Sequence, residues 1–237
     1  MSQGKRWMVA AALGTILAIG LATAASGQQP YYPYPPGCPP TTNTIVGTDA
    51  SDEIDGTGMA DLIFSLGGND DVDGRANDDC ILLGMGNDRG DGGGGDDWVL
   101  GEQGNDKIEG GRGDDRVDGG SGDDEVEGNS GDDRLFGRQG DDELEGGPGD
   151  DIARGGPGND EVEGDSGDDV VRGGSGNDRV RGGSGVDSMF GGAGFDRLFA
   201  FDGRRDDEVN CGPGFDVAIV DRRDPVSRNC EVVIRLR

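Results

Sequence analysis

The chain of 237 residues contains no histidine, and aromatic residues make up only 5% of it. The absence of histidine excludes Ser-His and Cys-His catalysis and every histidine-ligated zinc or haem site. A G-x-S-x-G nucleophile elbow is also missing. Hydrophobic residues account for 31%, and low hydrophobicity combined with high charge is typical of disordered chains.

Basic residues are scarce as well. The chain carries 21 Lys and Arg against 49 Asp and Glu, so its formal net charge is −28. An acid excess of this size disfavours binding to nucleic acid and to anionic membranes, and it favours cations.

Long apolar runs are limited to one stretch near the N-terminus, from Trp7 to Leu21. It follows Lys5 and Arg6 and precedes a cluster of small residues, so residues 1–25 are predicted to be a secretory signal peptide. The alternative is an uncleaved anchor, although the run is short for a membrane span. We therefore expect a secreted, extracellular protein without stable membrane insertion after the signal is removed.

Against these absences stands one regular feature: from Asp52 to Asp196, every ninth residue is aspartate. A fixed period predicts one structural unit copied along an axis, which is a solenoid and not a globule with one core. Stacked carboxylates repel one another unless a cation lies between them, so each copy is expected to contribute a metal ligand. The seventeen candidate ligands are Asp52, Asp61, Asp70, Asp79, Asp88, Asp97, Asp106, Asp115, Asp124, Asp133, Asp142, Asp151, Asp160, Asp169, Asp178, Asp187 and Asp196.

The repeating unit is a nonapeptide that reads Gly-Gly-x-Gly-x-Asp-x-U-x, where U is a large aliphatic residue, as in Gly110–Asp118. Glycine permits tight turns with positive φ, and x-U-x makes a minimal strand in which U points away from its neighbours. Seventeen copies cover residues 47–199. In early copies Ala50, Met59 and Asn77 replace the fourth glycine, which opens the alternative that the first few sites are empty.

These residues resemble the RTX, or hemolysin-type, calcium-binding repeat. The resemblance implies an all-β fold, a parallel β-roll (a β-solenoid) of about seventeen nonapeptide repeats with two repeats per turn. It also implies calcium ions bound between Gly-rich turns by aspartates and backbone carbonyls. Such oxygen ligands suit Ca²⁺ better than Zn²⁺. One buried aliphatic per nine residues cannot offset the entropy of ordering nine backbone units, so we expect calcium binding and folding to be one event.

Residues outside the repeats form two further segments. Residues 26–46 are rich in proline and tyrosine and are predicted to be an extended arm. Residues 200–237 are predicted to cap the roll: they contain a GPGFD stretch that places Asp216 in the aspartate position, and the residues after this echo lack the glycines. The four cysteines allow three connectivities. Cys211 and Cys230 flank the tail and are expected to pair, which leaves Cys38 with Cys80.

With two repeats per turn, the two sheets present different outer faces. One carries an apolar strip, which consists of Leu62, Phe64, Leu82, Trp98 and Leu100. We expect the arm, tethered by Cys38–Cys80, to cover this strip; the alternative is that the strip contacts another protein. The other face carries a ladder of Glu125, Glu143 and Glu161, which is either a solvated surface or a lattice for further cations, a mineral or a basic partner.

The pattern as a whole predicts a secreted calcium-binding protein and not an enzyme. Adjacent carboxylates such as Asp141 and Asp142 have the composition of a glycosidase acid and nucleophile, but the pair recurs in many copies, so metal ligation explains it more simply. RTX enzymes carry a separate catalytic domain, for which the C-terminal segment is too short. The alternative function is a calcium-dependent adhesion or binding module for a polysaccharide, a mineral or a partner protein surface.

Overall fold

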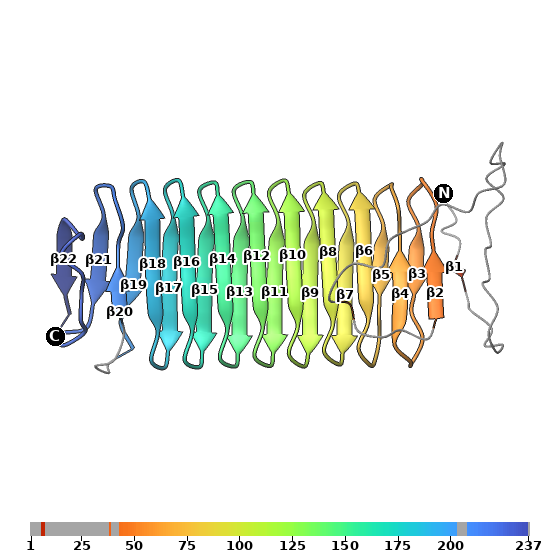
Figure 1. Cartoon of the computed structure of the whole chain (residues 1–237), viewed down its shortest axis with the longest axis horizontal. Coiled ribbons are helices and arrows are strands. Elements are labelled where there is room, and N and C mark those ends of the chain that lie inside the picture. The colour runs from red at the N-terminus through yellow and green to blue at the C-terminus, as the bar shows by residue number, and fades with distance from the viewer. Residues whose placement is uncertain (1–5, 8–37, 39–42, 203–207, 237) are drawn as a thin grey trace.

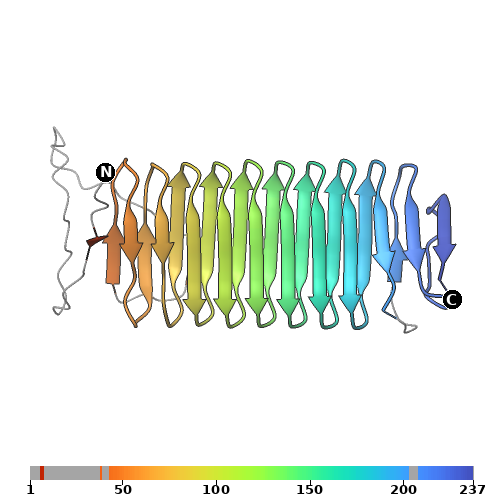
Figure 2. The same ribbon diagram turned by 180° about the vertical axis from the view of Figure 1, so that it is seen from behind.

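The computed structural model describes residues 6–7, 38, 43–202 and 208–236. These residues form strands and turns, with no helix among them. The strands stack along one axis into an elongated solenoid, and the chain alternates between two facing sheets as it advances (Figure 1). The view from behind shows the second sheet running alongside the first, with β21 and β22 of the longer sheet extending beyond β20 (Figure 2). The predicted all-β parallel solenoid is therefore confirmed.

One sheet contains the odd-numbered strands together with β22 and is called the odd sheet; the other contains the even-numbered strands to β20 and is called the even sheet. The odd sheet consists of β1 (Arg6–Trp7), β3 (Glu53–Asp55), β5 (Asp71–Asp73), β7 (Arg89–Gly94), β9 (Lys107–Arg112), β11 (Glu125–Ser130), β13 (Glu143–Pro148), β15 (Glu161–Ser166), β17 (Arg179–Ser184), β19 (Arg197–Ala200), β21 (Val217–Val220) and β22 (Val232–Arg235). The even sheet consists of β2 (Asn43–Val46), β4 (Asp61–Phe64), β6 (Cys80–Met85), β8 (Trp98–Gln103), β10 (Arg116–Ser121), β12 (Arg134–Gln139), β14 (Ile152–Pro157), β16 (Val170–Ser175), β18 (Ser188–Ala193) and β20 (Glu208–Asn210).

The register of neighbouring strands follows the repeat. Val117 of β10 pairs with Leu135 of β12, and Val126 of β11 pairs with Leu144 of β13. In both cases the partners are eighteen residues apart and the strands are parallel. Two nonapeptides therefore make one turn of the roll, as the resemblance implied.

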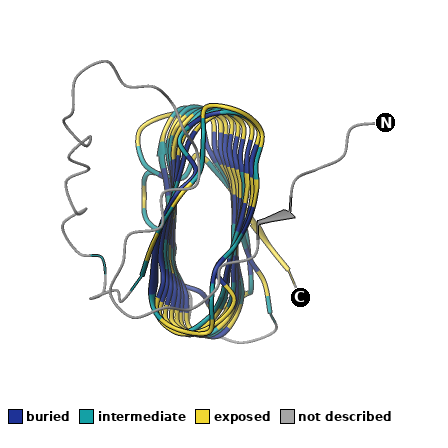
Figure 3. Ribbon diagram, turned by 90° about the vertical axis from the view of Figure 1, so that its right-hand side faces the viewer, coloured by how far each residue is buried: buried dark blue, intermediate teal, exposed yellow. Residues whose placement is uncertain are grey.

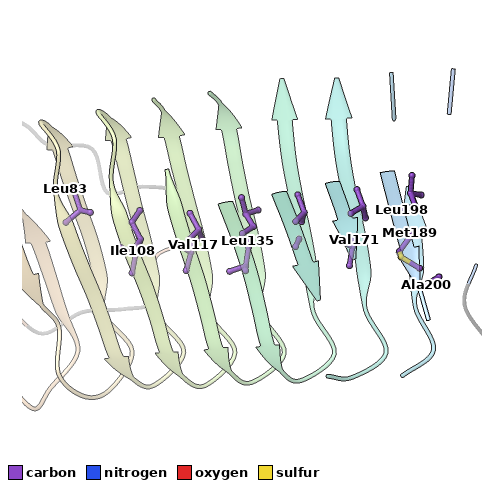
Figure 4. Packing of buried hydrophobic residues seen from close by; sticks show 14 of the residues in the cluster. Leu83, Ile108, Val117, Leu135, Val171, Met189, Leu198 and Ala200 are labelled. Carbon is purple, nitrogen blue, oxygen red and sulfur yellow. The ribbon is translucent and has the colours of Figure 1, made fainter. Parts of the chain in front are cut away.

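The core is a single row of side chains between the two sheets, one from each repeat (Figure 4). In the end-on view the buried residues line the inner side of both sheets (Figure 3). The buried U residues are Ile54, Ile63, Val72, Ile81, Val99, Ile108, Val117, Val126, Leu135, Leu144, Ala153, Val162, Val171, Val180, Met189 and Leu198. Their inward orientation confirms the alternation predicted for the x-U-x strands.

One repeat fills the core from an unexpected position. Its U residue is Gly90, which offers no side chain, and its first residue is Leu83 where glycine is usual. Leu83 is fully buried in the core. A Cβ placed on Gly90 would come within 3.0 Å of Leu83 Cδ1. The two departures from the repeat pattern thus compensate each other, because Leu83 occupies the space that a U side chain fills elsewhere.

Parallel pairing continues beyond the last regular repeat. β18 pairs with β20, and β19 pairs with β21, which in turn pairs with β22. Cys211 and Cys230 form a disulfide with a Cα–Cα distance of 5.2 Å. The predicted disulfide-stapled C-terminal end is therefore confirmed.

Part of the apolar strip on the even sheet is buried. Leu62, Phe64 and Cys80 form a small cluster outside the main core, and Cys38 packs against it. Cys38 and Cys80 form a disulfide, as expected. Apart from Cys38 and β2, the predicted arm lies outside the described residues, as does the predicted signal peptide apart from β1. The path of the arm over the strip stays a prediction.

The glutamate ladder on the odd sheet is flanked by bases. Glu125, Glu143 and Glu161 lie side by side on β11, β13 and β15. Lys107 forms a salt bridge with Glu125 at one end of the ladder, and Arg179 forms one with Glu161 at the other. Glu143, in the middle, is exposed and has no salt bridge to any described residue. Repulsion between like charges on adjacent strands is thereby reduced at both ends.

Candidate metal sites

The period-nine aspartates lie in two rows, one along each edge of the roll, because consecutive repeats turn at opposite edges. The row that precedes the odd strands contains Asp52, Asp70, Asp88, Asp106, Asp124, Asp142, Asp160, Asp178 and Asp196. The row that precedes the even strands contains Asp61, Asp79, Asp97, Asp115, Asp133, Asp151, Asp169 and Asp187. Asp52 is partly exposed, and all the others are buried.

A hydrogen-bond ladder links the aspartates within each row. The backbone N–H of each one donates to Oδ1 of the next aspartate in the row, eighteen residues further on, at 2.7–3.0 Å. Asp97 donates to Asp115, for example, and Asp115 donates to Asp133. The ladder satisfies one oxygen of each carboxylate from Asp70 and Asp79 onward and fixes its orientation.

The second carboxylate oxygen, Oδ2, is buried and accepts no hydrogen bond from any described residue at most of these positions. They are Asp70, Asp79, Asp88, Asp97, Asp106, Asp115, Asp124, Asp133, Asp142, Asp151, Asp160, Asp169, Asp178 and Asp196. A buried, unpaired carboxylate oxygen is costly unless a cation or a donor reaches it. Because this arrangement is repeated along both edges, we expect the same kind of partner for Oδ2 at all of these positions.

In most repeats the first glycine makes room for this oxygen; Ser65 and Leu83 take its place in the repeats of Asp70 and Asp88. A Cβ placed on Gly110 would lie 2.7 Å from Oδ2 of Asp115 and 2.9 Å from the carbonyl oxygen of Gly128. A carboxylate oxygen and a backbone carbonyl from the next turn thus converge beside a residue that has no side chain. Glycine is required here for close approach and not for its φ angle.

Burial shifts the titration of these groups. Desolvation raises the pKa of Asp79 and of Asp115 from 3.8 to about 8, and the pKa of Asp106 to about 6. The hydrogen bond from the preceding aspartate opposes the shift, and neighbouring carboxylates add to it. Without a counter-charge, therefore, these groups resist ionisation.

The donors present fit calcium. No three carboxylate, thiolate or imidazole side chains converge on one point within the described part of the chain. A cation at these positions must take backbone carbonyls in addition to aspartate, and this all-oxygen mixture is the type of ligand set that Ca²⁺ accepts. The unpaired Oδ2 atoms and the glycine-lined space beside them satisfy the first requirement of such a site.

Comparison with known families agrees with this geometry. A family model described as the RTX calcium-binding nonapeptide repeat matches four copies in the chain, at residues 55–89, 91–126, 127–162 and 163–198. The chain belongs to the RTX calcium-binding repeat family. No curated protein matches the chain. The RTX assignment carries calcium binding with it, and the resemblance inferred from the nonapeptide is confirmed.

Two of the predicted ligands depart from the RTX pattern. Oδ2 of Asp52 accepts hydrogen bonds from the backbone N–H and the hydroxyl of Thr48, at 2.7 and 2.8 Å. Oδ2 of Asp61 accepts the same pair from Thr57, at 2.6 and 2.9 Å. These two carboxylates are satisfied by the protein itself, unlike those further along the rows.

The RTX row on the odd edge also extends beyond the seventeen predicted positions. The N–H of Asp196 donates to Oδ1 of Asp216 at 2.9 Å, and Oδ2 of Asp216 is buried without a partner among the described residues. The N–H of Asp216 then donates to Glu231 at 2.9 Å. The GPGFD stretch signalled Asp216, but the spacing of twenty residues breaks the period and kept it out of the predicted ligands. Nothing in the period signalled Glu231.

The residue before each RTX aspartate forms a second ladder on the outside of the turns. The N–H of Asp114 donates to Oδ1 of Asp96, and the N–H of Asn159 donates to Oδ1 of Asp141. These residues are exposed. Asp141 and Asp142 therefore take different roles, one in the exposed outer ladder and one in the buried inner row, although they are adjacent in sequence.

Among the described residues, no helix has the length and apolar character needed to cross a membrane.

Proposed function

We propose that this chain is a secreted calcium-binding protein whose roll folds when Ca²⁺ binds between its aspartate-bearing turns. The observation that carries the proposal is the repeated buried Oδ2 atom that no described donor reaches. The proposed ligands are the aspartates of the two rows from Asp70 to Asp196, with Asp216 added, together with backbone carbonyls of neighbouring turns.

Folding and binding are coupled in this proposal. The core has one aliphatic side chain per repeat, and ordering the remaining residues of the repeat costs conformational entropy. In metal-free protein the buried carboxylates must also be either desolvated as anions or protonated. Calcium removes both difficulties at once, because it neutralises the carboxylates and crosslinks adjacent turns.

Circular dichroism during a calcium titration tests this proposal. The expected result is a cooperative change from coil to strand that a chelator reverses. Sodium chloride at the same ionic strength is the control and should not produce the change. A chain that is fully folded in metal-free buffer at neutral pH would contradict the proposal.

Secretion is the second part of the proposal. The two disulfides support it, because disulfides form and persist outside the reducing cytosol. The leader-like residues 1–25 support it as well. Fractionation of the producing cells, followed by mass spectrometry of the mature N-terminus, tests both points. A cytosolic protein with intact residues 1–25 would contradict them.

The proposal assigns no catalytic reaction to the chain. The carboxylates that would serve as acid and nucleophile are repeated along the roll, and the buried member of each pair is the proposed calcium ligand.

A second candidate function is binding of an anionic polysaccharide by the even sheet. Its outer side carries an arginine face, defined here as Arg116, Arg134, Arg154 and Arg172, on four successive strands of the sheet. None of the four forms a salt bridge with a described residue. Arg116, Arg154 and Arg172 stand over aromatic rings, as Arg172 does over Phe190 at 4.6 Å.

The chemistry of this face favours a polymer of acidic sugars. Guanidinium groups bind carboxylate and sulfate groups in a bidentate manner. Arg154 and Arg172 are direct neighbours on adjacent strands, which sets a spacing of about 4.8 Å. Arg116 and Arg134 form a second such pair, offset by two residues along the strands. Pairs of neighbouring cations suit a chain of repeated anions better than they suit an irregular protein surface.

A glycan array that contains acidic polysaccharides, probed with and without calcium, tests this second function. The double variant R154E/R172E is expected to lose binding. The matched control is R179E/R197E, which reverses two neighbouring exposed arginines on the odd sheet and should bind normally. Calcium-independent binding, or equal losses in both variants, would contradict it.

A further inference from the structure

The first two repeats satisfy their aspartates in a way that the rest of the roll does not. Thr48 and Thr57 hold the second position of these repeats, and each directs both its N–H and its hydroxyl to Oδ2 of the aspartate four residues later. In the later repeats named above, Oδ2 has no donor within the described part of the chain.

The backbone of the turn explains the difference. At the second position of later repeats the residue has a positive φ, such as 79° at Arg75 and 74° at Glu102. Thr48 and Thr57 do not adopt a positive φ. A β-branched side chain strongly disfavours that region. The first two turns therefore take another conformation, in which the N–H of the second residue points at the carboxylate.

This conformation leaves no place for a cation at Oδ2. The two donors present their positive ends to the oxygen that a metal ion would bind, and a metal ion would have to displace both charge-assisted hydrogen bonds. We propose that Thr48 and Thr57 take the place of calcium at Asp52 and Asp61, so that the first two repeats are a metal-free end of the roll. This inference rests on the calcium binding proposed above.

The second and the fourth positions both depart from the later repeats in these two turns, because Ala50 and Met59, like Thr48 and Thr57, lack a positive φ. The sequence pattern raised the possibility that Asn77, like Ala50 and Met59, marks an empty site because it replaces a glycine. Asn77 nevertheless has a positive φ of 70°, and the glycines at this position also have a positive φ, such as 139° at Gly95. Oδ2 of Asp79, in the same repeat, has no donor among the described residues, and the same is true of the Oδ2 atoms of the later aspartates named above. The repeat with Asn77 therefore binds calcium, and metal sites begin at Asp70 on one edge and Asp79 on the other.

The metal-free turns also prepare the first metal sites. The N–H of Asp52 donates to Oδ1 of Asp70 at 2.8 Å, and the N–H of Asp61 donates to Oδ1 of Asp79 at 2.7 Å. The capped aspartates thus orient the first calcium ligand of each row without needing a metal ion themselves.

Calcium counting by equilibrium dialysis on the full chain tests the inference with two matched double variants. D52N/D61N is expected to bind as much calcium as the wild type. D70N/D79N removes the same charge one turn later and is expected to bind less. Asparagine keeps an oxygen acceptor at each position, and circular dichroism at saturating calcium verifies that both variants fold.

Two outcomes would overturn the inference. One is an equal loss of bound calcium in D52N/D61N and D70N/D79N. The other concerns T48G/T57G. Glycine permits positive φ and removes both hydroxyl donors, so this variant is expected to gain bound calcium. Unchanged calcium binding in T48G/T57G would overturn the inference. Failure of the wild type to bind calcium at all would instead refute the proposed function, so the two failures are distinguishable.

Discussion

The backbone N–H of Asp97 donates a 2.7 Å hydrogen bond to Oδ1 of Asp115, which lies one turn further along the roll. Oδ2 of the same Asp115 side chain is buried and has no donor among the described residues. The protein thus satisfies one oxygen of the carboxylate and leaves the other without a donor, and this second oxygen is the proposed calcium ligand. The difference between the two oxygens underlies the first two predictions.

Replacing Asp115 with Asn should weaken calcium binding while preserving the ladder. Asparagine keeps an oxygen that can accept from Asp97 but removes the charge. Loss of a charged ligand interaction is expected to lower the affinity of that site by about tenfold or more, measured by titration calorimetry. Asp114→Asn is the control, because Asp114 is exposed and its Oδ1 serves the outer ladder. Equal effects of the two substitutions would contradict the assignment.

Metal-free protein should be more structured in acid than at neutral pH. The pKa of Asp115 is raised to about 8 and that of Asp133 to about 6, both from 3.8. A raised pKa in the folded state means that the roll binds more protons than the unfolded chain. The stability from protonation is therefore fully present below about pH 4 and is lost as the pH rises through the range from 6 to 8.

Circular dichroism in the presence of a chelator checks this trend, with more strand expected at pH 4.5 than at pH 8.5. Sodium chloride at pH 8.5 is the control for simple screening. With calcium the trend should reverse, because protons compete with the metal for the same oxygens. A metal-free chain that is more structured at pH 8.5 than at pH 4.5 would refute the prediction.

Gly110→Ala should destabilise the calcium-loaded roll, whereas Gly58→Ala should not. A Cβ on Gly110 would press on both Oδ2 of Asp115 and the carbonyl of Gly128. A Cβ on Gly58 meets nothing within 4 Å, and its φ is not positive. Overpacking typically costs about 1–3 kcal/mol, while Gly→Ala at a permissive site stabilises by about 0.4–1 kcal/mol. Thermal unfolding in calcium measures both effects. Similar shifts of the unfolding temperature in the two variants would contradict the role of Gly110 in making room for Oδ2 of Asp115.

The pairing of Leu83 with Gly90 predicts a rescue. Leu83→Ala should cost about 2–5 kcal/mol, because it leaves a cavity in the core row. The double variant L83A/G90V should recover much of this loss, since valine at the U position restores a side chain to the same space. Denaturant unfolding in calcium gives the coupling between the two sites. Additive losses would show that Leu83 does not fill the place of the missing U residue.

The sequence predicted the fold closely, because a strict period leaves few choices. The aspartates at every ninth position and the U residues two places later set the unit, and the resemblance supplied two repeats per turn, so register and core followed. The two disulfides were also predicted correctly. The mutual compensation of Leu83 and Gly90 was not predicted, because each looks like an isolated exception until both side chains meet in space.

The candidate sites were predicted in position but not in detail. The period predicted Asp52 and Asp61 to be metal ligands like the other aspartates. Only their hydrogen bonds from Thr48 and Thr57 distinguish them. Asp216 was noticed as an echo of the repeat but was out of phase. A periodic pattern cannot register such cases, because they depend on a local hydrogen bond or on an insertion that the fold absorbs.

By itself, the sequence determined that a repeated acidic unit stacks into a parallel roll and predicted that its carboxylates bind cations, since periodicity and charge are properties of the chain. Only the tertiary structure decided which oxygen of each carboxylate is left unpaired and which aspartates the protein satisfies without metal. The reason is that these properties depend on the direction of individual N–H and hydroxyl groups, and that direction is set by the φ angles of the folded turns.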